Sequence, residues 1–196
     1  MAALETEFGA LQQAYSIAGR VSDAVNGRNP LGLTLQRFVL TAFLDDTLIA
    51  ATARLERMSR GRYRLERRRE REDMRRASGL DLDVFDEFAG QARSVNTLSG
   101  GESFLASLSL ALGLADVVQS YAGGIRMEAL FIDEGFGTLD QEALDDALKT
   151  LMDLREKGRL VGIISHVPEL KERIDVRLEV TATRGGSQAK FHILDT

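Results

Sequence analysis

Apolar residues near the N-terminus recur at spacings of three and four, a period typical of an amphipathic helix. The stripe consists of Leu4, Phe8, Leu11, Tyr15, Ala18 and Val25. It predicts one long helix over residues 3–26, which fits the end of a coiled coil and, equally well, a single helix packed on a core. The stretch NGRNPLG then breaks the pattern, and a second helix is expected over residues 33–59.

Alternating apolar and polar positions follow the Gly61 break. Tyr63 and Leu65 share one face of residues 62–68, and residues 80–85 repeat the alternation with Leu80, Leu82 and Val84. We expect two strands of a small antiparallel piece here. An apolar run beginning after Ser99 then predicts a helix that ends near Tyr121.

The C-terminal third alternates apolar strands with a helix. EALFIDE and RLVGIIS each indicate a buried strand, and a helix is expected between them over residues 141–156. Strand, helix and strand at this spacing are typical of a βαβ unit, so the fold class is α/β with a parallel sheet flanked by helices. A short helix after Pro168 and a hairpin formed by RLEVTAT and AKFHIL complete the chain.

The composition excludes several classes of protein. In 196 residues, 44% are hydrophobic and 28% charged, as in an ordinary globular domain. We see neither an apolar run of membrane-spanning length nor a signal-peptide pattern, so a cytoplasmic protein without a membrane partner is expected. The chain has no cysteine and two histidines, which excludes disulfides, thiolate metal sites and a histidine-only zinc site.

Charge is distributed unevenly within the net charge of −5. Eleven arginines and five acids lie between Arg54 and Arg76. Such a patch can neutralise nucleic-acid phosphates, with Arg67, Arg68 and Arg69 as the candidate DNA-binding residues. A solvated face with paired charges four residues apart explains the same composition equally well.

The stretch TLSGGE opens the apolar run. Ser99 and Glu102 fit a capping box, in which each side chain satisfies a backbone N–H group at the start of a helix. The glycines at positions 100 and 101 are not explained by a cap, because a cap tolerates alanine there. Bare backbone at a helix start lets a phosphate approach the exposed N–H groups, so capping and phosphate binding are both open.

Two acids and a histidine follow the predicted parallel strands. Asp133 and Glu134 end the first strand, and His166 follows the second, so all three are expected at the sheet edge where α/β proteins present ligands. An acid there can hold Mg²⁺, a second can orient or deprotonate water, and a histidine can contact a phosphate. Each is also an ordinary surface residue at a strand end. Asp140, after the turn GFGTL, is well placed to cap the next helix.

The order of these motifs resembles the SbcC family of SMC-like, ABC-type ATPases. LSGGESFLASLSLALGLADVVQ, ALFIDEGFGTLD and GIISHVPELKERI are similar to the signature motif, Walker B with D-loop, and switch histidine of that family. LQRFVLTAFLDDTLIAATARLERMSRGRYRL is similar to it as well. The resemblance implies ATP and Mg²⁺ as cofactors, a head-to-head homodimer, an SbcD-like nuclease partner and double-stranded DNA.

The resemblance also implies a role for each site residue. Asp133 would bind Mg²⁺ through water, and Glu134 and His166 would be catalytic, polarising the hydrolytic water and sensing the γ-phosphate. Ser99, Gly100, Gly101 and Glu102 would contact a nucleotide held by the other head. Asp140 would reach across the same interface.

A phosphate cradle of the form G-x-x-x-x-G-K-[ST] is missing from the chain. The nearest stretch, residues 27–34, has leucine in place of the lysine and a proline that removes a donor, so we reject it. In the family the cradle lies in an N-terminal half, beyond a long coiled coil. We therefore predict a coiled-coil stub over residues 1–27 and the C-terminal lobe of an ATPase head over residues 28–196, inactive without its N-terminal half. The alternatives are a non-catalytic DNA-binding scaffold and a lobe of another SMC-like ATPase.

Overall fold

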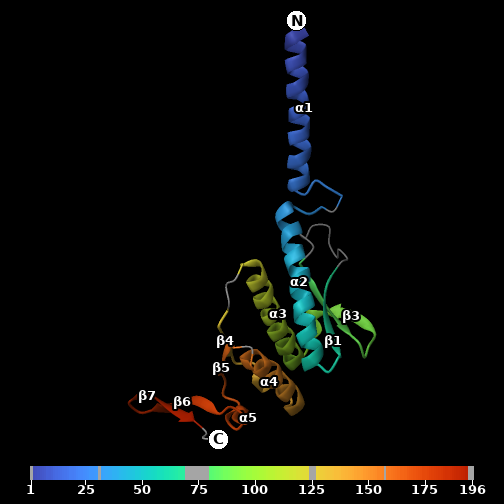
Figure 1. The fold of residues 1–196 in the computed structure, drawn as a ribbon. Coiled ribbons are helices and arrows are strands. Elements are labelled where there is room, and N and C mark those ends of the chain that lie inside the picture. Colours follow the sequence, from blue (N-terminus) through green and yellow to red (C-terminus); the bar gives the residue numbers. More distant parts are fainter. Residues whose placement is uncertain (1, 31, 69–79, 124–126, 157, 194–196) are drawn as a thin grey trace. The chain divides into compact units, whose positions relative to one another are not determined.

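The computed structural model describes residues 2–30, 32–68, 80–123, 127–156 and 158–193. Helices and strands follow in the order α1 (Ala2–Val25), α2 (Leu35–Met58), β1 (Tyr63–Arg67), β2 (Leu82–Asp86), β3 (Gln91–Ser94), α3 (Gly100–Tyr121), β4 (Ala129–Asp133), α4 (Gln141–Glu156), β5 (Leu160–Ile164), α5 (Pro168–Lys171), β6 (Val176–Thr183) and β7 (Gly186–Ile193) (Figure 1). Each helix predicted from the sequence is confirmed, and the bounds of α4 agree with the prediction at both ends.

The chain forms two compact units. Unit 1 comprises Met1–Leu98 and Leu105–Arg126, and unit 2 comprises Ser99–Phe104 and Met127–Thr196. These units do not test the predicted boundary between a stub over residues 1–27 and a lobe over residues 28–196, which stays a prediction.

Unit 1 is built on helix α2 and the antiparallel sheet β1-β2-β3. Tyr63 and Leu65 are buried on β1, and Leu65 pairs with the buried Val84 of β2. The hydroxyl of Thr52 on α2 both accepts from the N–H of Leu65 and donates to its carbonyl, each at 3.2 Å. Strand β3 was not expected, because QARS has no apolar alternation, and its pairing with β2 alone defines it.

Helix α3 lies against α2 along a close backbone approach. A Cβ added at Gly113 would stand 2.7 Å from the carbonyl oxygen of Thr47 and 2.8 Å from the nitrogen of Ala51. Two polar contacts also join these helices: an ion pair between Arg54 and Asp116, and a 2.8 Å hydrogen bond from the Tyr121 hydroxyl to Asp46. That bond raises the pKa of Tyr121. Glycine is therefore needed at position 113 for the two helices to pack.

Helix α3 corrects one expectation from the sequence. By length and composition it is apolar enough to cross a membrane, whereas no such run was expected. Eight of its residues are buried: Leu105, Ala106, Leu108, Ser109, Leu112, Gly113, Ala115 and Val117. Burial inside the protein therefore accounts for its apolar character.

Helix α1 exposes its apolar stripe. Leu4, Phe8, Leu11 and Tyr15 retain between 64% and 83% of their accessible surface. In this structure the helix therefore does not pack its apolar stripe on a core. Its stripe is available to another helix or chain.

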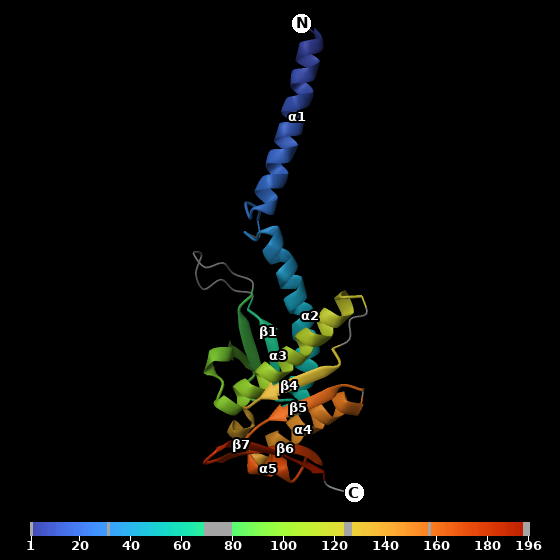
Figure 2. The same ribbon diagram turned by 90° about the vertical axis from the view of Figure 1, so that its left-hand side faces the viewer.

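Unit 2 contains the predicted βαβ arrangement. Strands β4 and β5 pair in parallel, with Asp133 opposite Ile164, and α4 is the connection between them. Figure 2 shows the two strands side by side with α4 next to them. The buried face of α4 carries Leu144, Ala147, Leu148, Leu151 and Leu154. Hydrophobic burial at helical spacing thus gives the α/β unit expected from the sequence.

The C-terminal hairpin β6-β7 has two different faces. Glu179 lies on one face, where it pairs with Lys171 and His192, and Arg177 donates to the Lys171 carbonyl at 2.8 Å. Apolar residues form the other face, and each remains at least half exposed: Val176, Leu178, Val180, Phe191 and Ile193. An isolated two-stranded hairpin is only marginally stable in water, so burial of this apolar face against another surface would stabilise it.

Candidate functional site

The structure brings Asp133, Glu134 and His166 to one edge of the β4-β5 sheet. Asp133 ends β4, and the backbone N–H of Glu134 donates to the carbonyl of Ile164, the last residue of β5, at 2.9 Å. Nδ1 of His166 lies 2.8 Å from Oε2 of Glu134. The predicted convergence of the two strand ends is therefore confirmed.

The Glu134–His166 pair is open to solvent. The side chain of Glu134 is 49% exposed and that of His166 is 81% exposed. An ionised carboxylate can only accept, so a hydrogen bond here requires the ring form that carries its proton on Nδ1, which leaves Nε2 as the second nitrogen of the imidazole. Both groups are accessible to a substrate.

Glu134 also has an unusual backbone. Its φ is 60°, in the left-handed region that costs a residue with a side chain about 1 to 3 kcal/mol. Gly135 follows with φ of 97°. A Cβ at Gly135 would overlap the Phe104 ring. That ring packs edge-on against the Phe136 ring, with the two centroids 4.9 Å apart. These two phenylalanines were missed in the sequence, although they hold the turn that presents Glu134.

Asp133 is the candidate magnesium ligand. Its residue is exposed, and among the described residues its carboxylate makes no hydrogen bond or ion pair. A carboxylate oxygen free to coordinate fits the hard-ligand preference of Mg²⁺. The described part of the chain contains no group of three or more His, Cys, Asp or Glu arranged to hold a metal. Asp133 would therefore supply one ligand, and the others would be water or oxygens from outside these residues.

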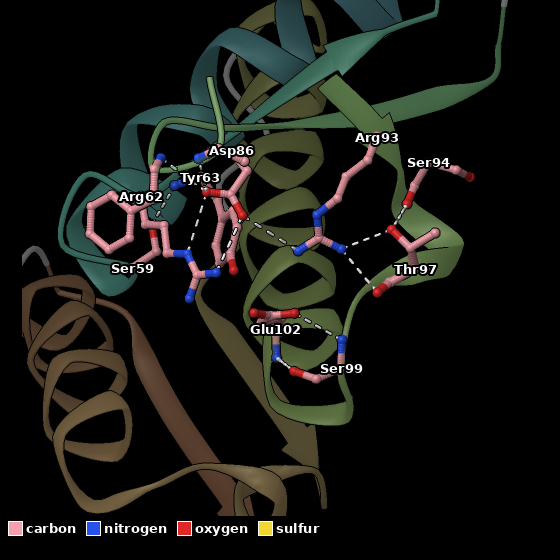
Figure 3. A network of polar contacts seen from close by, with 11 residues as sticks. Ser59, Arg62, Tyr63, Asp86, Arg93, Ser94, Thr97, Ser99 and Glu102 are labelled. Atoms are coloured by element: carbon pink, nitrogen blue, oxygen red, sulfur yellow. Dashed lines mark hydrogen bonds and ion pairs between the residues drawn. The ribbon is translucent and has the colours of Figure 1, made fainter. Parts of the chain in front are cut away.

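Ser99 and Glu102 form the predicted capping box. The backbone N–H of Ser99 donates to Oε2 of Glu102 at 2.9 Å, and the N–H of Glu102 donates to the Ser99 hydroxyl at 3.4 Å (Figure 3). Ser99 and Gly100 are both exposed. The cap is thus real, and it leaves these positions of the motif accessible.

The two glycines of the motif differ in their surroundings. A Cβ at Gly101 would stand 2.7 Å from the backbone oxygen of Thr138, whereas one at Gly100 would make only ordinary contacts with the Thr138 side chain, at 3.6 Å and beyond. Thr138 is itself held by a 2.8 Å bond from its hydroxyl to the Gly135 carbonyl. Packing therefore requires glycine at position 101. Packing does not explain the glycine at position 100, where a methyl group would fit.

This difference predicts opposite outcomes for two similar variants. Gly101→Ala should destabilise unit 2 by about 1 to 3 kcal/mol, because the added methyl group meets backbone that cannot rotate away. Gly100→Ala should leave the unfolding free energy nearly unchanged. Urea denaturation followed by circular dichroism measures both. Equal losses in the two variants would show that the contact with Thr138 is not what selects glycine.

Asp140 caps helix α4. Its Oδ1 accepts from the backbone N–H of Ala143 at 2.8 Å, as expected from the sequence. A cavity of about 280 Å³ lies beside His166, lined by Phe136, Gly137, Leu139, Gln141, His166 and Pro168 among others. The turn between β4 and α4 and the loop after β5 thus form one recessed surface.

The arginines proposed for DNA binding are engaged in ion pairs. Arg67 contacts Asp45 through two bonds of 2.7 and 3.1 Å, and this hydrogen bonding raises the pKa of the guanidinium. Arg68 contacts Asp83 at 2.5 to 3.0 Å. Arg69 lies outside the described residues. A phosphate would have to compete with two carboxylates for the first two arginines.

Solved structures place this fold among the heads of SMC ATPases. An Smc head bound to the C-terminal winged-helix domain of ScpA aligns with a TM-score of 0.57 at 17% identity, covering 78% of this chain and 44% of that one. A structure from work on ATP-driven dimerization of SMC ATPases gives 0.59 at 18% identity, covering 81% and 90%. The chain has the fold of an ABC-type, SMC-like ATPase head.

Sequence relatives specify the class further. Residues 69–153 match the family model described as SbcC/RAD50-like, Walker B motif. The SbcC component of the SbcCD nuclease from Vibrio cholerae is 57% identical over 182 residues, which is 93% of this chain and 18% of the relative. The chain is similar to SbcC over most of its own length, and it spans about a fifth of the length of that relative.

Proposed function

We propose that this chain is the C-terminal half of an SbcC-like ATPase head. It supplies the signature motif, Walker B acids, D-loop and switch histidine for ATP hydrolysis when two heads pair. The observation that carries the proposal is the convergence of Asp133, Glu134 and His166 on one exposed sheet edge, with Glu134 and His166 in direct contact. The hydrolysis gates an SbcD-like nuclease acting on double-stranded DNA ends.

Glu134 is the residue that acts on the attacking water. Its carboxylate orients the water and accepts its proton, while the contact with His166 holds the carboxylate in place. Asp133 would supply one ligand to Mg²⁺, which when bound would neutralise charge on the phosphates. At the exposed start of α3, Ser99 would offer its hydroxyl and Gly100 its backbone N–H to the phosphate of the opposite head, since the Ser99 N–H is already bonded to Glu102. Asp140, at the start of α4, adds to the same interface.

Exposed apolar surface supports a missing second half. Parallel sheets are ordinarily covered on both faces, yet Phe131, Leu160 and Ile164 of the β4-β5 sheet are between 55% and 67% exposed. The apolar face of β6-β7 is equally open. A phosphate cradle is also missing from the sequence. An N-terminal half would supply the cradle and could cover the exposed apolar surface.

Head pairing is supported by the similar SMC structure, whose subject is ATP-driven dimerization and DNA-stimulated activation of SMC ATPases. The nuclease partner is supported by the name of the relative, a component of the SbcCD nuclease. The DNA-binding scaffold is less well supported, because Arg67 and Arg68 are already paired with Asp45 and Asp83.

Reconstitution tests the proposal directly. The chain alone should not hydrolyse ATP, and addition of an N-terminal half carrying the phosphate cradle should produce turnover. Phosphate release measured on each half and on their mixture gives the result. Turnover by the chain alone would contradict the proposal, as would a mixture that forms a stable complex and remains inactive.

A further inference from the structure

Arg93 holds the turn that leads into the signature motif. From strand β3 its Nη1 donates to the carbonyl of Thr97 at 2.9 Å and to the Thr97 hydroxyl at 2.8 Å (Figure 3). Thr97 lies two residues before Ser99 in the chain. One guanidinium nitrogen therefore determines the orientation of both the peptide and the side chain at this position.

The turn itself is closed by local bonds. The Thr97 hydroxyl donates to the Ser94 carbonyl at 2.7 Å, and the N–H of Leu98 donates to the Val95 carbonyl at 3.2 Å. Residues 94–98 thus form a hydrogen-bonded turn. The side chain of Arg93 links this turn to strand β3.

Asp86 holds the other side of the Arg93 guanidinium. Its side chain is only 5% exposed, and its Oδ2 lies 3.8 Å from Nη2 of Arg93 and 3.3 Å from Nη2 of Arg62. Oδ1 also accepts from the backbone N–H groups of Phe88 and Ala89. Burial alone would raise the pKa of Asp86, but the bonds from Arg62 and these N–H groups leave it below its usual value. An ionised Asp86 therefore anchors Arg93.

We propose that Arg93 is a positioning residue for the signature motif, holding the backbone before Ser99 in the conformation that meets a nucleotide on the opposite head. The inference rests on the proposed role of that motif. Arg93 itself touches no reacting group. Its effect reaches Ser99 through Thr97 and Leu98, and a displacement of about 1 Å at such a site can cost about 100-fold.

The test is ATP-driven dimerisation of the full-length protein, made in a Glu134→Gln background so that ATP is not consumed. Adding Arg93→Ala should raise the ATP concentration needed for half-maximal dimerisation at least about tenfold. Binding of a fluorescent ATP analogue to the monomer should stay within about twofold, because the signature motif serves the other head. Light scattering measures the dimer. A dimerisation curve that does not shift would overturn the inference.

Arg64→Ala is the matched control. Arg64 lies on the same sheet, pairs with Glu66 and Glu87 at 3.4 and 3.3 Å, and lies over the Phe85 ring, so its loss is comparable in charge and packing. It should leave dimerisation unchanged. An equal shift in Arg64→Ala would assign the effect to general weakening of the sheet and overturn the inference.

A second variant covers the case in which Arg93→Ala does not fold. Thr97→Val keeps the ion pair between Arg93 and Asp86 but removes the hydroxyl that Arg93 contacts, and with it the exposed bond from that hydroxyl to the Ser94 carbonyl. Dimerisation should weaken at least about threefold with the thermal midpoint nearly unchanged, and an unshifted curve would overturn the inference. If the Glu134→Gln parent does not dimerise with ATP, the proposed function fails instead.

Discussion

Glu134→Gln should lower ATP turnover by the assembled head at least about 100-fold, because a general base of this kind contributes about 10² to 10⁴ in rate. Glutamine has nearly the same shape as glutamate but cannot take a proton from water. It can still contact His166, so the fold of the sheet edge should persist. Phosphate release under single-turnover conditions measures the loss of the chemical step, and nucleotide affinity should be retained.

The control for this variant lies on the same strand. Glu128 is an exposed glutamate immediately before β4, at the opposite end from Glu134. Glu128→Gln makes the same chemical change where no reacting group is expected, and its turnover should equal that of the unmodified protein. Turnover of Glu134→Gln within about threefold of the unmodified protein would remove Glu134 from the reaction.

Gly113→Ala should destabilise unit 1 by about 2 kcal/mol or more, through overpacking of helices α2 and α3. A single added methyl group would meet backbone atoms of Thr47 and Ala51 at 2.7 and 2.8 Å. Backbone cannot change rotamer, so the two helices must separate. Urea denaturation of the chain should show a lower midpoint of unfolding.

Gly19→Ala is the same substitution in a different environment. Gly19 lies inside helix α1 with no atom within 4 Å of an added Cβ. Alanine favours a helix by up to about 1 kcal/mol relative to glycine, so α1 should become more helical in this variant. The two substitutions should therefore act in opposite directions. An increase in stability from Gly113→Ala would refute the close helix approach.

Local patterns of the sequence determined a large part of this fold. The spacing of Leu144, Leu148 and Leu151 marks α4, and the apolar runs before Asp133 and Ser165 mark the two parallel strands. The capping roles of Ser99 and Asp140 were also readable. These features depend on neighbours within one or two turns of chain, so their residues carry the information themselves.

The order of the motifs also predicted which side chains converge. Acids after one parallel strand and a histidine after the next must meet at the same edge, because parallel strands end on the same side of a sheet. The contact between Glu134 and His166 follows from this topology. The distance between the two side chains and their exposed fractions came only from the structure.

Tertiary structure alone decided the features that join distant residues. Strand β3 carries no apolar pattern and exists through its pairing with β2. Arg67 forms an ion pair with Asp45, 22 residues earlier in the chain. No local charge pattern predicts this pairing.

Gly101 is selected by the Thr138 backbone and Arg93 by Thr97 and the buried Asp86. By itself, the sequence determined the elements and the chemistry at their ends, because periodicity and caps are properties of neighbouring residues. Which glycine must stay bare and which arginine is already paired depends on atoms that only the folded chain brings together.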